Sequence, residues 1–370
     1  MIPVTRPWLP ARANLDKYLD GIYERRWLTN NGPLVQTLTQ RLQQWLGVEN
    51  LLLVGNGTLA LQIAYRVLDV TPHDRQAAEA VTTPFSFIAT ASSLRWEGIA
   101  PVFADINSQT WCLDAEQAAK AITADTKALV PVHVFGNACD VESFDQLADL
   151  HQIKLIYDGA HAFGAKHGGK SLLSYGDACT LSFHATKLFH SIEGGAIVFK
   201  RESDLDKAKQ MINFGITGPD CIESLGINAK MNEFQAAMGL CVLDELEQQL
   251  PAREQVWKSY HAALNTELIL QQQNCQSSCN HAYFPVLLDS EAELLHCMRK
   301  LTDHGIQTRR YFYPSLDSLH WLGTQQALPV SRDISSRVLC LPLYAELSPQ
   351  QAEAIAQLLL SSRADFQGVA

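Results

Sequence analysis

The chain has 370 residues, of which 47% are apolar and 18% are charged, and its formal net charge is -10. The apolar fraction excludes an intrinsically disordered chain, and the length allows one large or two modest domains. The acidic balance argues against nucleic-acid binding. The sequence contains no apolar run of the roughly 18–20 residues that a membrane span needs. Its first residues lack the apolar stretch of a secretory signal, so we expect neither a membrane nor a secretory protein.

Cysteine usage predicts a cytoplasmic protein. Nine cysteines lie between Cys112 and Cys340 without the spacing of a disulfide framework. Cys275 and Cys279 precede His281 and loosely resemble half of a zinc site. The other half of such a site is missing, so we interpret these cysteines as buried or solvated thiols and predict no metal.

Strand-like and helical patterns alternate along the first two-thirds of the chain. Helical spacing predicts helices over 35–47, 58–70, 113–122 and 141–152, and short apolar runs predict strands over 51–57, 80–87, 101–106, 127–136 and 153–162. This alternation predicts a mainly parallel sheet that is covered by helices.

The pattern changes after about residue 245. The stretch 232–265 predicts a long helix that is broken near Pro251, because proline interrupts helical hydrogen bonding. A strand over 281–289 and helices over 291–305 and 350–362 follow. We therefore predict a large domain over 1–245 and a smaller α/β domain over 246–370.

Polar residues that follow the predicted strands are the first candidates for a site, because ligands of open parallel sheets collect at the carboxyl ends of strands. The glycine turn at 55–60 opens a helix and could bind phosphate, although a plain tight turn is the alternative. Asp158 ends an apolar strand, where a carboxylate could hold a proton on a heterocyclic nitrogen or act as a turn residue. His161 is close enough to share that site.

Lys187 lies in a short polar loop between two apolar segments. A partly desolvated lysine has a lowered pKa and attacks carbonyl groups, whereas a solvated loop lysine does not. Phe87 could stack on a flat ring or pack in the core. Glu193, before two glycines, could make a polar contact or belong to a turn, and His133 is ambiguous between a core residue and a site residue.

These features fit one cofactor when they are taken in chain order. A phosphate seat, a stacking aromatic, a carboxylate for a ring nitrogen and a carbonyl-reactive lysine predict a pyridoxal 5'-phosphate site. Thr58, its neighbouring N–H groups and the hydroxyl of Ser182 would hold the phosphate.

Motifs throughout the chain also resemble the nucleotide-sugar aminotransferases of the DegT/DnrJ/StrS group. The matching segments are WLTNNGP (27–33), NGTLAL (56–61), PFSFIATASS (84–93), VFADI (102–106), PVHVFGNACD (131–140), YDGAHAFGA (157–165), SFHATKLFHSIEGGAIV (182–198), GINAKMNEFQAAMG (226–239) and CLPLYAEL (340–347). The resemblance implies a pyridoxal-phosphate enzyme of fold type I, the aspartate-aminotransferase-like α/β architecture.

The resemblance also implies residue roles. Lys187 would be the Schiff-base lysine, Asp158 the partner of the pyridine nitrogen, His161 a contact on the ring-hydroxyl side and Phe87 the stacking residue. The phosphate positions would be Gly57, Thr58 and Ser182, together with Asn228 from a neighbouring subunit, so a homodimer with shared sites is implied. Candidate substrate contacts are Glu193, Tyr311 and Tyr313, with Arg309 and Arg310 beside them.

The substrate follows from a finer likeness. The segment Ile192–Gly195 resembles members that aminate a sugar at C4, which carry Glu-Gly-Gly, rather than the C3 group with Gly-Asp-Gly-Gly. The implied reaction transfers the amino group of L-glutamate to C4 of a nucleotide-linked sugar, dTDP-4-dehydro-6-deoxy-D-glucose, for a surface polysaccharide such as the lipopolysaccharide O-antigen. A 3-keto dTDP-sugar, a UDP-linked 4-keto sugar and a cofactor-binding sensor without turnover are the alternatives.

Overall fold

The computed structural model describes residues 1–72, 77–323 and 327–368, and its centre is a seven-stranded sheet. The strand order is β1-β9-β8-β5-β4-β2-β3, and β9 alone runs antiparallel to its neighbours. The expected mainly parallel sheet is therefore confirmed. Its strands are β1 (Leu51–Val54), β2 (Glu79–Thr82), β3 (Ala100–Phe103), β4 (Thr126–Val130), β5 (Lys154–Asp158), β8 (Ala178–Ser182) and β9 (Gly195–Phe199).

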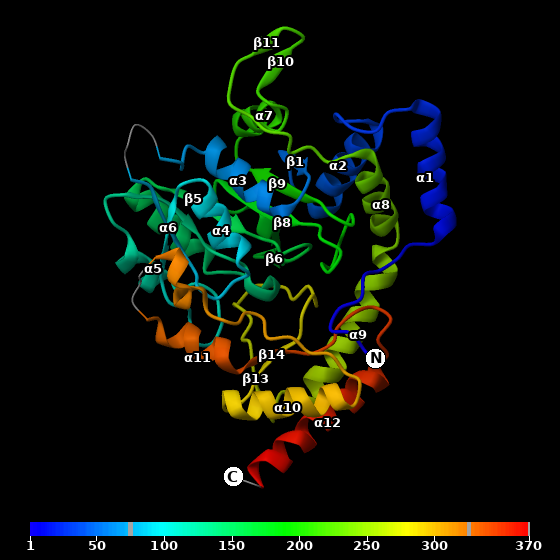
Figure 1. The fold of residues 1–370 in the computed structure, drawn as a ribbon, viewed down its shortest axis with the longest axis vertical. Helices are drawn as coiled ribbons and strands as arrows, with labels where there is room; N and C mark the ends of the chain where they lie inside the picture. Colours follow the sequence, from blue (N-terminus) through cyan, green and yellow to red (C-terminus); the bar gives the residue numbers. More distant parts are fainter. Residues whose placement is uncertain (73–76, 324–326, 369–370) are drawn as a thin grey trace.

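Helices cover both faces of this sheet, because successive side chains of a strand point to opposite faces. In β1, Leu51 and Leu53 join one apolar core, while Leu52 and Val54 join a second core. The first core includes residues of α2 (Pro33–Leu46), α5 (Ala115–Ala121), α6 (Val141–His151) and α8 (Glu233–Asp244). The second includes residues of α3 (Gly57–Val67), α4 (Ala89–Trp96) and α7 (Glu202–Met211). The sheet thus has a buried face on each side (Figure 1).

Several strands are shorter than the sequence predicts. The predicted strand over 80–87 stops at Thr82, because the chain turns where the backbone N–H of Phe85 donates a hydrogen bond to Oγ1 of Thr83. The predicted strand over 127–136 stops at Val130 and is followed by the short helix η1 (Val134–Gly136). The residues that follow Thr82 and Val130 lie at the edge of the sheet, where they can contribute to a site.

The predicted break near Pro251 is wrong. Pro251 lies inside α9 (Leu246–Leu264), and the break separates α8 from α9 at Glu245. The carboxylate of Glu245 accepts hydrogen bonds from the indole of Trp8, the side chain of Asn14 and the backbone of Ala11. These contacts with the N-terminal segment hold the chain at Glu245, whereas Pro251 removes only one backbone donor within a 19-residue helix.

A second group of elements lies at the C-terminal end of the chain. The sheet β12 (Ile269–Leu270), β13 (Pro285–Leu287) and β14 (Val338–Cys340) is antiparallel. A third apolar core combines this sheet with α9, α10 (Glu291–Asp303) and α12 (Pro349–Gln367), which lie together in the lower part of Figure 1. Helix α11 (Pro329–Arg337) leads into β14. The division into domains at residue 245 stays a prediction.

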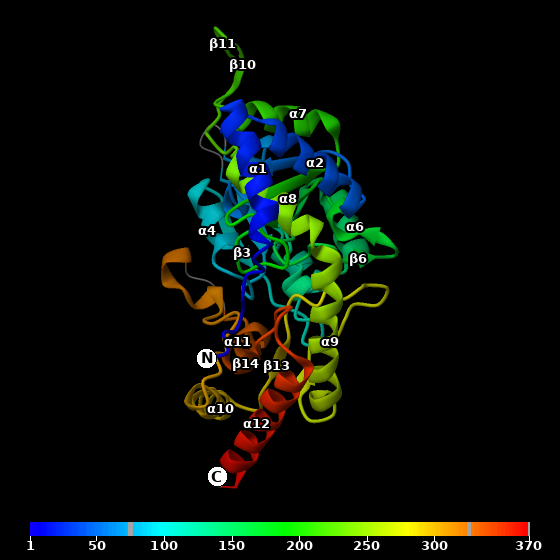
Figure 2. The ribbon, with the colours of Figure 1, turned by 90° about the vertical axis from the view of Figure 1, so that its right-hand side faces the viewer.

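The remaining elements are peripheral. Helix α1 (Arg12–Arg25) lies along α8, and the hairpin of β10 (Ile216–Gly218) and β11 (Cys221–Ile222) projects from the body beyond α7 (Figure 2). Short elements complete the description: β6 (Lys166–His167), β7 (Lys170–Ser171), η2 (Leu172–Ser174), η3 (Leu316–Ser318) and η4 (His320–Leu322). Within the described residues, no helix combines the length and apolarity of a bilayer span.

Candidate active site

A cavity of about 620 Å³ lies where the parallel strands end. Residues that follow β1, β2, β4, β5 and β8 line it, as expected when carboxyl ends of parallel strands meet at one edge. Most of the predicted site residues are among them: Gly57, Thr58, Phe87, Asp158, His161, Ser182, Lys187, Glu193 and Tyr311.

Two predicted site residues lie outside this cavity. The ring of Tyr313 is covered by the guanidinium of Arg310, whose Cζ lies 3.4 Å from the ring centroid. Asn228 is exposed and forms an isolated bridge with Asn213. A further cavity of about 500 Å³, between α2 and the segment ending at Met231, contains none of the predicted site residues.

The beginning of α3 forms an anion seat. The side chain of Asn56 caps the helix by accepting a hydrogen bond from the N–H of Leu59. The N–H groups of Gly57 and Thr58 belong to the first turn, where a helix has no acceptor for them. A Cβ on Gly57 would lie 2.9 Å from Cβ of Ser182, so only glycine allows the serine hydroxyl so near these donors. Donors and helix dipole together favour an anion.

Asp158 is a buried carboxylate at the end of β5. Its Oδ2 accepts a 2.7 Å hydrogen bond from Thr90, and its Oδ1 accepts a 3.1 Å bond from the N–H of Ala160. Burial raises the pKa of Asp158, while these hydrogen bonds and the charge of Lys187 act in the opposite direction. The carboxylate is thus held in a fixed orientation and its anionic form would be stabilised by a cation in the cavity.

Lys187 is a partly buried amine in the same cavity. Burial lowers its pKa to about 8, with Arg309 acting in the same direction and Asp158 opposing it. Its Nζ lies 3.5 Å from the hydroxyl of Tyr283, to which it donates a long hydrogen bond. The lowered pKa increases the neutral fraction of this amine near neutral pH, and the neutral form is the one that a nucleophile or a base requires.

His161 is neutral and fixed. Burial, followed by the charge of Lys187, lowers its pKa well below the ordinary histidine value. Its Nδ1 accepts a hydrogen bond from the N–H of Phe135, which leaves the ring proton on Nε2. The ring is parallel to those of Phe135 and Phe312, with centroids 6.1 and 5.7 Å away. His161 can therefore offer one N–H donor from a rigid aromatic layer.

The remaining lining groups are more accessible. Phe87 is 51% exposed and lines the cavity, so its ring can contact a planar ligand. Glu193 lies near His184, with Oε1 and Nε2 3.7 Å apart. The guanidinium of Arg309 lies over the ring of Tyr311, and in the described parts of the chain it makes no ion pair. This side of the cavity therefore offers the guanidinium of Arg309, the hydroxyl of Tyr311 and the carboxylate of Glu193 to a polar substrate.

The structure adds three residues that the sequence reasoning did not select. Thr90 supports Asp158, and Ser86 donates a 2.8 Å hydrogen bond to Thr90, whose own proton goes to the carboxylate. Tyr283 contacts Lys187 from a distant part of the chain. The motif that contains Ser86 and Thr90 was recognised, but a sequence carries no local signal that pairs Thr90 with Asp158 or Tyr283 with Lys187.

Comparison with known proteins identifies the chain. The profile of the DegT/DnrJ/EryC1/StrS aminotransferase family matches residues 11–360. The chain belongs to this family. The aminotransferase is 39% identical over 359 residues to a dTDP-4-amino-4,6-dideoxy-D-glucose transaminase of Shigella dysenteriae, covering 95% of this chain and 96% of the relative. It is 35% identical over 369 residues to an Escherichia coli protein of the same name, covering 97% and 98%.

A solved structure extends this similarity to the fold. The aminotransferase superposes on DesI, crystallised in the presence of its TDP-sugar product, with a TM-score of 0.91 and 32% identity over 100% of this chain and 94% of that one. The expected aspartate-aminotransferase-like architecture of fold type I is therefore confirmed, as is the family that the motifs indicated.

Proposed function

We propose that this aminotransferase converts dTDP-4-dehydro-6-deoxy-D-glucose and L-glutamate to dTDP-4-amino-4,6-dideoxy-D-glucose and 2-oxoglutarate, with pyridoxal 5'-phosphate as cofactor. The observation that carries the proposal is the convergence of Lys187, Asp158 and the α3 anion seat on one cavity. Two relatives named for this activity are 39% and 35% identical over nearly the whole chain. We infer a cytoplasmic location from this substrate class and from the reduced cysteines.

The residues of the cavity fit the proposed cofactor. The N–H groups of Gly57 and Thr58 and the hydroxyl of Ser182 would bind its phosphate. Phe87 would contact one ring face, and the N–H of His161 would face the ring hydroxyl. Asp158 would hold the proton of the pyridine nitrogen. When bound, the cofactor supplies a carbonyl carbon that reacts with amines and a ring that accepts electrons.

Lys187 is the catalytic residue in this proposal. The neutral amine of Lys187 would hold the cofactor through its carbonyl carbon, with loss of water, and would be free to act as a base once the amino group of glutamate had taken its place. Its Nζ would take the proton from Cα of glutamate and return it to the carbon that the cofactor's carbonyl supplies. In the second half of the reaction Lys187 moves a proton in the reverse direction, toward C4 of the sugar.

The polar side chains of Arg309, Tyr311 and Glu193 favour an anionic, hydroxylated substrate. Arg309 has no ion-pair partner among the described residues, and the diphosphate of a nucleotide sugar would neutralise it. Tyr311 could contact the nucleotide or the sugar ring, and Glu193 could accept hydrogen bonds from sugar hydroxyls. Tyr313 is outside the cavity, so any contact with substrate would be to a part that extends beyond it.

We also infer a homodimer with shared sites. The segment between α7 and α8, which contains Asn228 and the projecting hairpin of Figures 1 and 2, carries several exposed apolar side chains: Phe214, Ile216, Ile222, Leu225 and Ile227. An apolar surface of this kind favours burial against a partner. Asn228, which does not line the cavity of its own subunit, would then complete the phosphate seat of the neighbouring subunit.

The proposal is tested by product analysis. Purified protein is incubated with L-glutamate and one keto sugar at a time: the dTDP-linked 4-keto sugar, a dTDP-linked 3-keto sugar and a UDP-linked 4-keto sugar. We expect amination of the first, with the nitrogen located on C4 by NMR. Preference for another acceptor would replace the substrate assignment, and cofactor binding without any product would favour a sensor.

A lysine variant tests the mechanism. Lys187→Ala should lose turnover and should show no borohydride-stable cofactor adduct by mass spectrometry. Lys170→Ala, which removes an exposed lysine in β7, is the matched control and should retain both. Full turnover by Lys187→Ala would reject the mechanism.

A further inference from the structure

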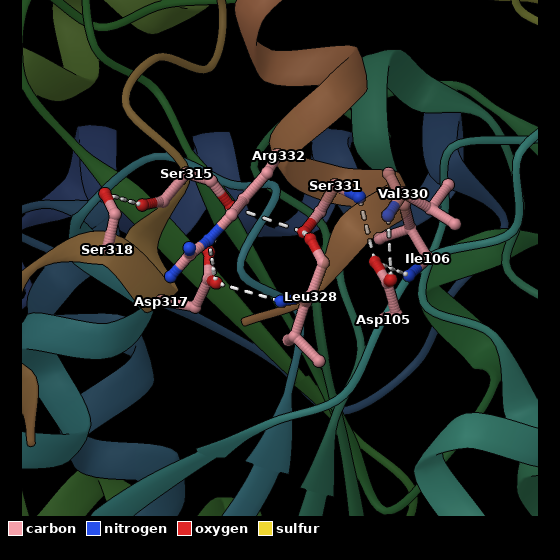
Figure 3. Close-up of polar contacts among 9 residues, drawn as sticks. All are labelled: Asp105, Ile106, Ser315, Asp317, Ser318, Leu328, Val330, Ser331 and Arg332. Carbon is pink, nitrogen blue, oxygen red and sulfur yellow. Dashed lines mark hydrogen bonds and ion pairs between the residues drawn. The ribbon is translucent and has the colours of Figure 1, made fainter. Parts of the chain in front are cut away.

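A network of polar groups joins the residues that follow β3 to α11 and to the chain around residue 316 (Figure 3). Asp105, which follows β3, is 7% exposed. Its Oδ2 accepts a 2.9 Å hydrogen bond from the N–H of Val330, and its Oδ1 accepts one of equal length from the N–H of Ser331. The two donors form the first turn of α11, more than 200 residues later in the chain.

Asp105 takes the place of a local helix cap. Leu328 occupies the N-cap position of α11 and has no side-chain acceptor to offer. Helices need such an acceptor, because their first N–H groups have no partner within the helix. Here the cap comes from the sheet, so capping α11 also fixes the helix to the sheet edge.

Asp317 joins the chain around residue 316 to α11. Its buried carboxylate accepts hydrogen bonds from the hydroxyl of Ser315, at 2.6 Å, and from Nε of Arg332, at 2.7 Å. The hydroxyl of Ser315 is also 3.3 Å from that of Ser331. The chain around residue 316 and the first half of α11 therefore behave as one unit, which Asp105 attaches to the sheet.

This unit is directly connected to the cavity wall. Helix α11 continues into β14, where Cys340 and Arg309 exchange backbone hydrogen bonds of 2.8 and 3.2 Å. At the other end, the N–H of Leu316 donates to the carbonyl of Pro84, and the ring of Phe312 packs edge-on against Phe85. A shift of α11 would therefore move the segment that carries Arg309, Tyr311 and Phe312.

We propose that Asp105 is a positioning residue that sets the distance between the substrate wall, residues 309–312, and Lys187. Asp105 is not among the residues that line the cavity, and its carboxylate accepts hydrogen bonds from the N–H groups of Ile106, Val330 and Ser331, which do not line it either. Its carboxylate acts through α11 and β14 on the wall. The inference rests on the proposed function only for the identity of the substrate that this wall contacts.

The experiment compares Asp105→Ala with a matched capping variant. Asp140 caps α6 by accepting the N–H of Ser143 and is not part of the network, so Asp140→Ala removes a cap without moving the wall. For Asp105→Ala we expect the KM for the dTDP-linked keto sugar to rise by about tenfold, with kcat within about threefold of the parent. Asp140→Ala should leave both unchanged.

Hydrogen exchange provides a readout that needs no substrate. We expect backbone amides of 309–316 to exchange faster in Asp105→Ala than in the parent or in Asp140→Ala. Asp105→Asn keeps one acceptor oxygen and the side-chain shape, so it should fold and give an intermediate effect on both readouts.

The outcomes separate this inference from the proposed function. Unchanged exchange over 309–316 in both Asp105 variants would overturn the positioning role, whatever the substrate. An unchanged KM with faster exchange would also overturn it, because the wall would then move without affecting binding. If the parent aminates no dTDP-linked sugar but the exchange difference remains, the proposed function fails while the connection from Asp105 to the wall stands.

Discussion

The hydroxyl of Thr90, on α4, donates a 2.7 Å hydrogen bond to Oδ2 of Asp158, at the end of β5. Ser86 in turn donates to Thr90, so a chain of two hydroxyls ends on the buried carboxylate. The segment from Ser86 to Thr90 thereby fixes the orientation of the carboxylate proposed to hold the ring nitrogen.

Thr90→Val should weaken cofactor binding. The change keeps the side-chain shape but removes a hydrogen bond to a charged group, and we expect affinity for pyridoxal phosphate to fall by about tenfold. Titration followed by visible absorbance measures this. Thr82→Val is the control, because it removes the buried hydroxyl that donates to the carbonyl of Val130 instead. Equal losses in both variants would contradict a specific role for Thr90.

The rate at which the cofactor-free protein captures pyridoxal phosphate should depend on the charge of Lys187. The neutral amine is the reactive form, so the rate should rise with pH and level off above the pKa of Lys187, about 8. Arg309→Gln removes a nearby positive charge that lowers this pKa, and should move the midpoint to higher pH. Arg299→Gln, which changes an exposed arginine in α10, should not. A midpoint that stays in place in Arg309→Gln would refute the coupling.

Gly57→Ala should damage the anion seat selectively. A Cβ at this position would meet Ser182 at 2.9 Å, so the serine and the start of α3 would have to move apart. We expect about tenfold or greater loss of affinity for pyridoxal phosphate. Pyridoxal without the phosphate serves as the control ligand, and its binding should change little. A similar loss for both ligands would indicate a general disruption of the cavity.

Mixed dimers should show whether Asn228 acts across subunits. One subunit carries Lys187→Ala and the other Asn228→Ala, and differently tagged chains are co-purified. If Asn228 completes the neighbouring site, each mixed dimer contains one site with both residues intact and should recover half of the parent activity. If Asn228 serves its own subunit, neither site is intact. The mixed dimer should then be no more active than dimers in which both subunits carry Lys187→Ala or both carry Asn228→Ala.

Local patterns were enough to predict the sheet and most of the proposed site residues that line the cavity. Strands such as 51–54 and 154–158 contain runs of apolar residues, and the polar groups at their ends fall at one edge because parallel strands share a direction. The ends of elements were less predictable. The hydroxyl of Thr83 shortens β2, and Glu245 rather than Pro251 divides the long helix through contacts with the N-terminal segment.

The sequence by itself determined the family, the alternating α/β architecture and the chain order of the residues proposed to bind the cofactor, because each depends on residue types at short, fixed spacings. Only the tertiary structure decided which groups support them: Thr90 beside Asp158, Tyr283 beside Lys187, and Asp105 at the start of α11. Each of these pairs is separated by at least 68 residues. Their contact depends on how strands and helices pack, and neither periodicity nor motif spacing carries that information.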